Sequence, residues 1–232
     1  MAELVVALDF DDALDALNMA GALRGHVSWV KVGLELFISE GPRVLHSLKG
    51  LGFNVFLDLK LYDIPNTVRG AALAAAASGA DMMTLHLGGG ERMCRAAVEA
   101  MAGQEHAPLL MGVTVLTSFA EGELPGCSML LGDLAKTLAS GAAAWGMNGV
   151  VCSGHEVAAI KKAHPALLCL TPGIRLAGSG GDDQRRVMTP AQAVRNGSDF
   201  LVVGRPITRA EHPAAVADAV QADILNVKTS EK

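Results

Sequence analysis

Charged side chains that close short apolar runs are the residues of this sequence best suited to do chemistry. One run ends with Asp58 and Lys60, and Asp63 follows soon after. An earlier run ends in Asp9, and another contains Lys31. Side chains two positions apart in a strand point the same way, so we expect Asp58 and Lys60 to lie on the same side of the strand. A fixed ammonium group can stabilise developing negative charge or deliver a proton, which makes this set a candidate acid–base centre.

A structural ion-pair network is the alternative explanation for the same charged residues. Buried ion pairs are a weak source of stability, whereas charges gathered at the carboxyl ends of strands usually serve function. The functional interpretation is therefore favoured.

Two segments near the end of the chain predict a phosphate site. The segment TPGIR (171–175) precedes glycines at 178, 180 and 181, and VVGRPIT occupies 202–208. Glycine-rich loops can bring backbone amides to an anion. Gly204 permits close approach of the backbone, and the Arg205 guanidinium can bind phosphate oxygens in pairs. A helix that starts directly after would add the positive end of its dipole. The alternative is that Gly204 is only a turn residue and Arg205 only a surface residue.

Other polar residues carry weaker signals. Thr117 and Ser118 follow an apolar run and could hydrogen-bond a polar ring or merely cap a turn. His86 closes another run, where a lone histidine is more often a hydrogen-bonded wall than a catalyst. The remaining histidines and the four cysteines show no metal-ligand spacing, so we expect no metal site and reduced, buried thiols.

The elements that must position these residues repeat along the chain. Apolar runs rich in Val, Ile and Leu, without polar alternation, are typical of strands buried on both faces. Helical patterns separate them, and Thr189-Pro190 and Asn196-Gly197 are start and stop signals for one such helix. The runs lie at 4–8, 27–32, 54–59, 82–87, 108–116, 149–152, 167–170 and 200–203.

Eight strand–helix units in 232 residues give about 29 residues per unit, which predicts a single-domain (β/α)8 barrel. An open doubly wound sheet is the alternative, although eight units would make it unusually wide. We expect the barrel to span 1–225 and a polar tail to occupy 226–232. In such barrels the chemistry lies at the carboxyl ends of the strands, with phosphate sites near strands 7 and 8.

Composition excludes several classes of protein. Half of the residues are apolar, which excludes a disordered chain, and a net charge of −5 disfavours nucleic-acid binding. The first apolar run is only five residues long and is flanked by acids, so we expect no signal peptide, no membrane span and a cytoplasmic location. The alanine-rich stretch 71–77 is apolar nearly all round, which predicts a face buried against another subunit.

The segment DLKLYDIPNT (58–67) carries a resemblance to a known family. Together with VVALD (5–9), WVKVG (29–33), VLTSF (115–119), TPGIR (171–175), DQRR (183–186) and VVGRP (202–206), it closely resembles the bacterial orotidine 5′-monophosphate decarboxylases. The resemblance covers essentially the whole chain. One departure is Tyr62, where the family often has His or Phe, and this side chain lies outside the acid–base set.

The resemblance implies conversion of orotidine 5′-monophosphate to uridine 5′-monophosphate and carbon dioxide, the last step of de novo UMP synthesis, without metal or organic cofactor. It implies that Lys60 protonates C6, that Asp58 lies against the substrate carboxylate, and that Lys31 and Asp63 complete an alternating charge array. It further implies a homodimer in which Asp63 and Thr67 reach the partner's site.

The resemblance also distributes the substrate-binding roles. Asp9 and Lys31 would hold the ribose hydroxyls, and Thr117 and Ser118 the pyrimidine edge. The phosphate region would contain Arg175, Gln184, Gly204 and Arg205, and Pro172 would also bind the substrate.

Two other functions remain open at this point. A magnesium-dependent sugar-phosphate decarboxylase or aldolase of the same superfamily shares the DxKxxD core, and Glu35 would be a candidate ligand there. A catalytically silent phosphometabolite-binding barrel is the second, although a mere binder has no need of an alternating charge set.

Overall fold

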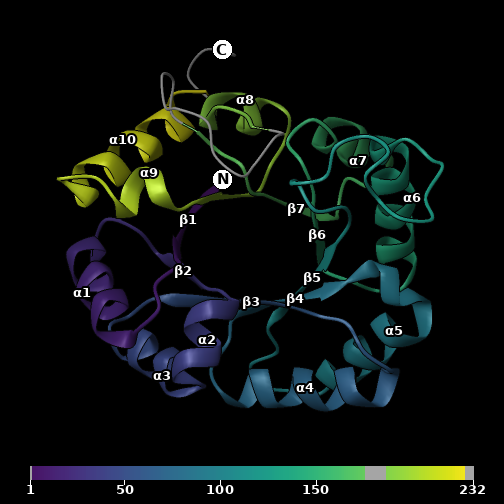
Figure 1. Ribbon diagram of the computed structural model, residues 1–232, viewed down its shortest axis with the longest axis horizontal. Helices are drawn as coiled ribbons and strands as arrows, with labels where there is room; N and C mark the ends of the chain where they lie inside the picture. Colours follow the sequence, from purple (N-terminus) through teal and green to yellow (C-terminus); the bar gives the residue numbers. More distant parts are fainter. Residues whose placement is uncertain (1, 176–186, 228–232) are drawn as a thin grey trace.

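The strands close into a complete parallel barrel surrounded by helices. The structure is a computed structural model that describes residues 2–175 and 187–227. Strands β1 to β8 follow one another around the barrel in sequence order, and β8 pairs with β1. The helices form an outer ring (Figure 1). The (β/α)8 prediction is confirmed, and an open doubly wound sheet is excluded.

Each of the eight predicted apolar runs overlaps one strand. The strands are β1 (Glu3–Leu8), β2 (Trp29–Val32), β3 (Asn54–Leu61), β4 (Met82–His86), β5 (Leu109–Val113), β6 (Gly149–Val151), β7 (Leu168–Thr171) and β8 (Phe200–Val203). The largest error is in the run 108–116, because β5 ends at Val113. Beyond it the chain turns, and the Phe119 N–H donates to the Leu116 carbonyl at 3.1 Å. Thr117 and Ser118 therefore lie in a turn after the strand.

The helices follow the strands as the pattern predicts. They are α1 (Ala13–Leu23), α2 (Leu34–Glu40), α3 (Arg43–Gly50), α4 (Pro65–Ala77), the short 3-10 helix η1 (Leu87–Gly89), α5 (Gly90–Met101), α6 (Leu131–Ala144), α7 (Val157–Ala163), α8 (Pro190–Arg195), α9 (Arg205–Thr208) and α10 (Pro213–Asn226). Helix α8 starts at the predicted cap, where the Gln192 N–H donates to the Thr189 hydroxyl, and its C-cap is Asn196. Among the helices of the described ranges, none combines the length and the apolar character needed to cross a bilayer.

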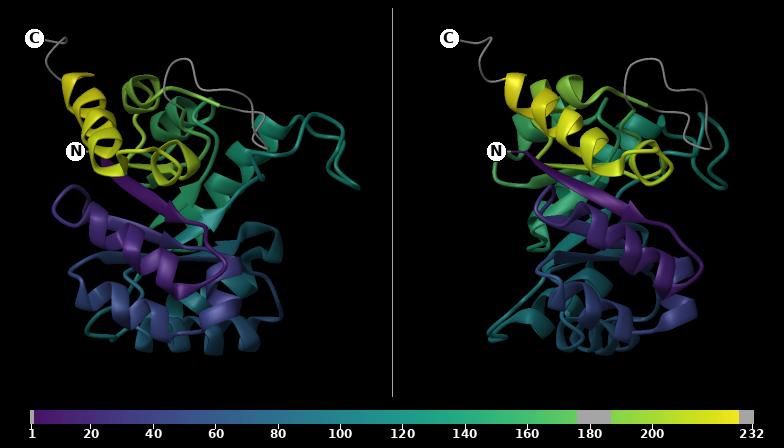
Figure 2. Two further views of the ribbon diagram at one scale, coloured as in Figure 1. Left: turned by 60° about the vertical axis from the view of Figure 1, so that its left-hand side comes forward. Right: turned by 90° about the vertical axis from the view of Figure 1, so that its left-hand side faces the viewer.

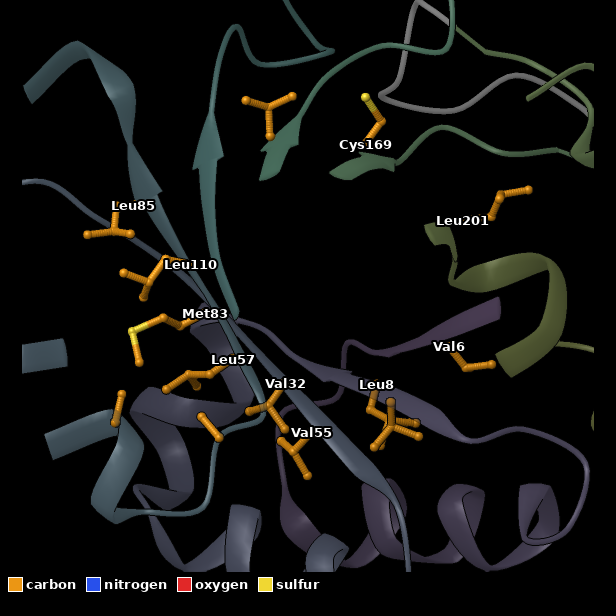
Figure 3. Close-up of a cluster of buried hydrophobic side chains, with 14 of the residues drawn as sticks. Val6, Leu8, Val32, Val55, Leu57, Met83, Leu85, Leu110, Cys169 and Leu201 are labelled. Carbon is orange, nitrogen blue, oxygen red and sulfur yellow. The ribbon is translucent and has the colours of Figure 1, made fainter. Parts of the chain in front are cut away.

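The core has two layers, which explains why the strands lack polar alternation. One cluster of buried side chains comes from six strands around the ring and fills the barrel; it comprises Val5, Ala7, Phe56, Met82, Met111, Leu170, Phe200 and Val202. The intervening residues, including Val6, Leu8 and Leu57, belong to a larger cluster between the strands and the helices (Figure 3). Both faces of each strand are buried, so both carry apolar side chains.

Three features lie outside the regular barrel pattern. The connection between β5 and α6 projects from the body of the barrel (Figure 2). Helix α10 continues to Asn226, which is exposed, and Val227 after it is buried, so the folded part of the chain extends two residues into the predicted tail. The four cysteines are free thiols; Cys127 is only half-buried, unlike the other three.

Candidate active site

A cavity of about 220 Å³ lies at the carboxyl ends of the strands and collects most of the predicted site residues. Nine of those residues line it: Asp9, Lys31, Asp58, Lys60, Thr117, Pro172, Arg175, Gly204 and Arg205. They come from both halves of the sequence, and barrel closure brings them together because β8 pairs with β1. Apolar side chains, including Val113, Val115 and Val151, complete the wall.

Four charges alternate in sign across the first three strands. Asp9 Oδ1 lies 2.7 Å from Lys31 Nζ, Lys31 Nζ lies 3.8 Å from Asp58 Oδ2, and Asp58 Oδ2 lies 2.9 Å from Lys60 Nζ. The side chains of Lys31 and Asp58 are 10% and 14% exposed, whereas that of Lys60 is 31% exposed. Lys60 is thus the array's more accessible ammonium group.

The Asp58 carboxyl is held in its ionised form. Its burial raises its pKa, but the charges of Lys31 and Lys60, with hydrogen bonds from Lys60 and Thr84, more than offset this and leave the pKa below its ordinary value. Asp58 is therefore a fixed negative charge at neutral pH. It lies between two cations at the bottom of the cavity.

Side chains along β3 alternate between two sides, and this alternation directs Asp58 and Lys60 to the cavity. Phe56, Asp58 and Lys60 line the cavity, while Leu57 and Leu59 face a separate apolar hollow beneath α4. The expectation that Asp58 and Lys60 face the same way is confirmed.

The backbone of this segment departs from a regular strand. Lys60 has φ 52°, in the left-handed region that non-glycine residues seldom adopt. Its N–H donates to the Thr84 hydroxyl at 2.9 Å, and that hydroxyl donates to Asp58 Oδ1 at 3.0 Å. Sequence reasoning missed Thr84, because a single threonine inside an apolar run carries no functional signal.

Gly33 leaves the space in which the Asp9–Lys31 pair forms. A Cβ built on Gly33 would lie 2.9 Å from Lys31 Nζ and 3.1 Å from Asp9 Oδ1. Gly33 is also the N-cap of α2, with φ −91°, so its backbone places no special demand on the residue type. Its missing side chain is what this position requires.

The predicted phosphate residues gather at the β7 and β8 side of the cavity. Arg175, Gly204 and Arg205 all line it. An added Cβ on Gly204 would make an ordinary contact, 3.4 Å from Ala7 Cβ, so packing within the chain does not itself require glycine there. Helix α9, which follows Gly204, has only four residues, so its dipole contributes less to anion binding than the sequence predicts. Two guanidinium groups remain the main positive charges at this end.

Three predicted residues in the described part of the chain do not line this cavity. Asp63 and Thr67 are exposed on the β3–α4 connection and on α4, and Asp63 Oδ1 accepts the Ile64 N–H at 2.6 Å. Ser118 is exposed beside the buried Thr117. A fourth predicted residue, Gln184, lies outside the described residues, as do the glycine-rich loop 177–184 and the whole of DQRR (183–186).

Two further candidates of the sequence lie beside the cavity. His86 ends β4, and its ring accepts a hydrogen bond from the Gly88 N–H at 3.4 Å. Burial, with a smaller contribution from the Lys60 charge, lowers its pKa, which suits a neutral wall residue. Glu35 is exposed and borders a neighbouring polar hollow with Asp11 and Arg209, apart from Lys60.

Sequence comparison relates this chain to known proteins. The family described as "Orotidine 5′-phosphate decarboxylase / HUMPS family" matches residues 2–220. A protein named orotidine 5′-phosphate decarboxylase from Nitratidesulfovibrio vulgaris (strain Hildenborough) is 62% identical over 98% of this chain and all of its own length. One from Lawsonia intracellularis is 52% identical over 97% of this chain and all of its own length.

Solved structures agree in fold. The crystal structure of orotidine 5′-phosphate decarboxylase from Lactobacillus acidophilus superposes with a TM-score of 0.86 at 35% identity, and the match covers 97% of this chain and 99% of that one. The structure of an uncharacterized conserved protein from Geobacillus kaustophilus gives 0.83 at 36% identity, covering 95% and 99%.

Proposed function

Because this chain belongs to the orotidine 5′-phosphate decarboxylase / HUMPS family, we propose that it converts orotidine 5′-monophosphate to uridine 5′-monophosphate and carbon dioxide. The observation that carries the proposal is the alternating array of Asp9, Lys31, Asp58 and Lys60 at the bottom of a cavity whose other side holds two arginines. Relatives that share 62% and 52% identity carry this enzyme's name, which favours it over the sugar-phosphate enzymes of the superfamily.

The reaction requires electrostatic stabilisation of the negative charge that develops on the substrate. As the bond between C6 and the carboxylate breaks, its electron pair stays on C6, and the pyrimidine offers no electron sink of the pyridoxal type. We assign to Lys60 the role of stabilising this charge and giving C6 a proton from Nζ, after which solvent restores that proton. The exposure of Lys60 Nζ toward the cavity, beside a buried carboxylate, supports this role.

Asp58 and Lys31 are the fixed charges of this mechanism. The buried Asp58 carboxylate would face the substrate carboxylate, and the repulsion between the two would be relieved as carbon dioxide leaves. Lys31 lies between Asp58 and Asp9 and would, with Asp9, also hold the ribose hydroxyls. We propose that the partner's copy of Asp63 completes the array, with Thr67 beside it.

Remote binding would supply the energy that positions the ring. We assign the phosphate to Arg175, Gln184, Gly204 and Arg205, and the pyrimidine edge to Thr117 and Ser118. Pro172 is assigned to substrate binding as well. Binding energy from a dianionic phosphate can be spent on desolvating and orienting the reacting atoms. The proposal includes no metal and no organic cofactor.

The test is the loss of orotate absorbance when the purified chain meets orotidine 5′-monophosphate in excess EDTA. We expect rapid loss with uridine 5′-monophosphate as product, and loss that needs added magnesium would contradict metal independence.

Lys60→Ala should abolish turnover but keep affinity for uridine 5′-monophosphate, because the phosphate and ribose contacts remain. A Lys60→Ala variant with most of its kcat would remove Lys60 as the proton donor.

A further inference from the structure

Thr84 lies beside the irregular part of the strand that carries Asp58 and Lys60. Leu57 on β3 pairs with Met83 on β4, and Leu61 pairs with Leu85. Residues 58–60 of β3 therefore lie alongside Thr84 alone. Thr84 is fully buried, so this arrangement is shielded from solvent.

The irregularity coincides with an unusual backbone conformation at Lys60. Within residues 2–175 and 187–227, Lys60 is the one non-glycine residue with φ in the left-handed region. Such conformations persist where surrounding contacts hold them, and they cluster at active sites. Here the Lys60 N–H donates to the Thr84 hydroxyl at 2.9 Å, so a side chain holds the backbone where regular pairing is interrupted.

The same hydroxyl also fixes the Asp58 carboxylate. It donates to Oδ1 at 3.0 Å, while Oδ2 lies 2.9 Å from Lys60 Nζ and 3.8 Å from Lys31 Nζ. Because one carboxylate oxygen is bound from behind, the other is turned toward the two ammonium groups. One hydroxyl thus accepts from the lysine backbone and donates to the carboxylate, a combination that Ser can reproduce and Val cannot.

We propose that Thr84 is a positioning residue that sets the relative placement of the Asp58 carboxylate and the Lys60 side chain for decarboxylation. The inference rests on the proposed function. Thr84 does not line the cavity, so it acts through Asp58 and Lys60 and not on substrate. Its other side borders the apolar hollow beneath α4, with Leu57, Leu59 and Leu61, so an apolar replacement of similar size meets compatible neighbours there.

Thr84→Val and Thr84→Ser separate positioning from packing. For Thr84→Val we expect kcat to fall about 10- to 100-fold, the effect of losing a hydrogen bond to a charged group in the transition state. Its affinity for uridine 5′-monophosphate, measured by calorimetry, should stay within about threefold, because that ligand lacks the 6-carboxylate and is bound by remote contacts. Thr84→Ser should keep kcat within about threefold of the wild type, since the hydroxyl remains.

Thr114→Val is the matched control. Thr114 is also buried, directly after β5, and its hydroxyl donates to the Val151 carbonyl at 2.8 Å and not to Asp58 or Lys60. The same chemical change there should leave kcat within about twofold. If Thr84→Val does not fold, Thr84→Cys, with a weak donor of similar size, should show the fall in kcat.

The outcomes distinguish this inference from the function on which it rests. A wild-type chain that does not decarboxylate orotidine 5′-monophosphate overturns both. With an active wild type, the Thr84 role alone is overturned if Thr84→Val keeps its kcat, if Thr84→Ser is equally impaired, or if uridine 5′-monophosphate affinity falls as much as kcat.

Discussion

Single residues set the spacing of the charges in this site. Asp9, Lys31, Asp58 and Lys60 approach one another within 2.7 to 3.8 Å, from three neighbouring strands. Removing such charges from water costs free energy that their mutual attraction seldom exceeds by much, so the array is better explained by chemistry than by stability. Small changes in the space around these groups should therefore alter activity more than folding.

Gly33→Ala tests this at the point of closest packing. An added methyl group would meet Lys31 Nζ at 2.9 Å and Asp9 Oδ1 at 3.1 Å, and the lysine tip would have to move. We expect kcat/KM to fall about tenfold or more, because a charged hydrogen bond is displaced, while the Tm changes by less than about 4 °C. Steady-state kinetics and a thermal scan measure both quantities.

Gly21→Ala is the control for that substitution. Gly21 lies in α1, and nothing lies within 4 Å of an added Cβ. This change should leave kcat/KM unaltered. Full activity of Gly33→Ala would show that the Asp9–Lys31 contact is dispensable.

Residue types were enough to predict much of the site, whereas its remaining features depend on backbone conformation and strand register. Asp58, Lys60, Lys31 and Arg205 were identifiable because charged side chains at the ends of apolar runs need an explanation. Thr84 was not, because its role depends on a register shift that no residue type reveals. The left-handed backbone of a lysine was equally invisible, since sequence reasoning expects that conformation at glycine.

At the scale of elements, apolar runs were sufficient to predict every strand, while their ends were less certain. The run 108–116 continued to Leu116 because apolar residues also line the cavity beyond the strand, as Val115 does. Burial, and not strand geometry, produced that pattern. Caps and turn residues gave sharper boundaries than hydrophobicity did.

The capping box of α8 is the clearest of these boundary signals. The Gln192 N–H donates to Thr189 Oγ1 at 3.3 Å, and Gln192 Oε1 accepts from the Thr189 N–H at 3.1 Å. Thr189→Ala should destabilise the fold by about 1 kcal/mol and lower the Tm by about 2–4 °C. Thr189→Ser keeps the hydroxyl and should restore the Tm in the same thermal scan. Equal losses in both variants would mean that the hydroxyl cap contributes little to stability.

At the scale of the whole molecule, charge is distributed unevenly. The chain has a net charge of −5, yet the cavity is lined by four cations, Lys31, Lys60, Arg175 and Arg205, against the two carboxylates Asp9 and Asp58. This local excess of two positive charges suits a phosphorylated substrate, whereas the acidic exterior disfavours nucleic acids. The composition could exclude a class of ligand, but only barrel closure could bring the cations together.

The same scale includes the proposed dimer. Asp63 and Thr67 are exposed and do not line their own chain's cavity, and Tyr62 and Ile64 beside them are 64% and 67% exposed. Exposed apolar side chains next to charged ones are typical of an interface. These observations support the proposal that the β3–α4 connection reaches a second copy of the chain.

Mixing two inactive variants tests whether sites are shared between subunits. In a hybrid of Lys60→Ala and Asp63→Ala chains, one site carries both changes and the other carries neither. With random assembly, half of the dimers are hybrids with one intact site of two, so about one quarter of the wild-type activity should return. A mixture of Lys60→Ala and Asp58→Ala should recover nothing, because both residues line the same chain's cavity and every site is then impaired.

Activity should be measured after joint refolding, with hybrids counted by mass spectrometry of differently tagged chains. Hybrids that form without restoring activity would assign Asp63 to its own chain's site, and a chain that stays monomeric while active would remove the dimer from the mechanism.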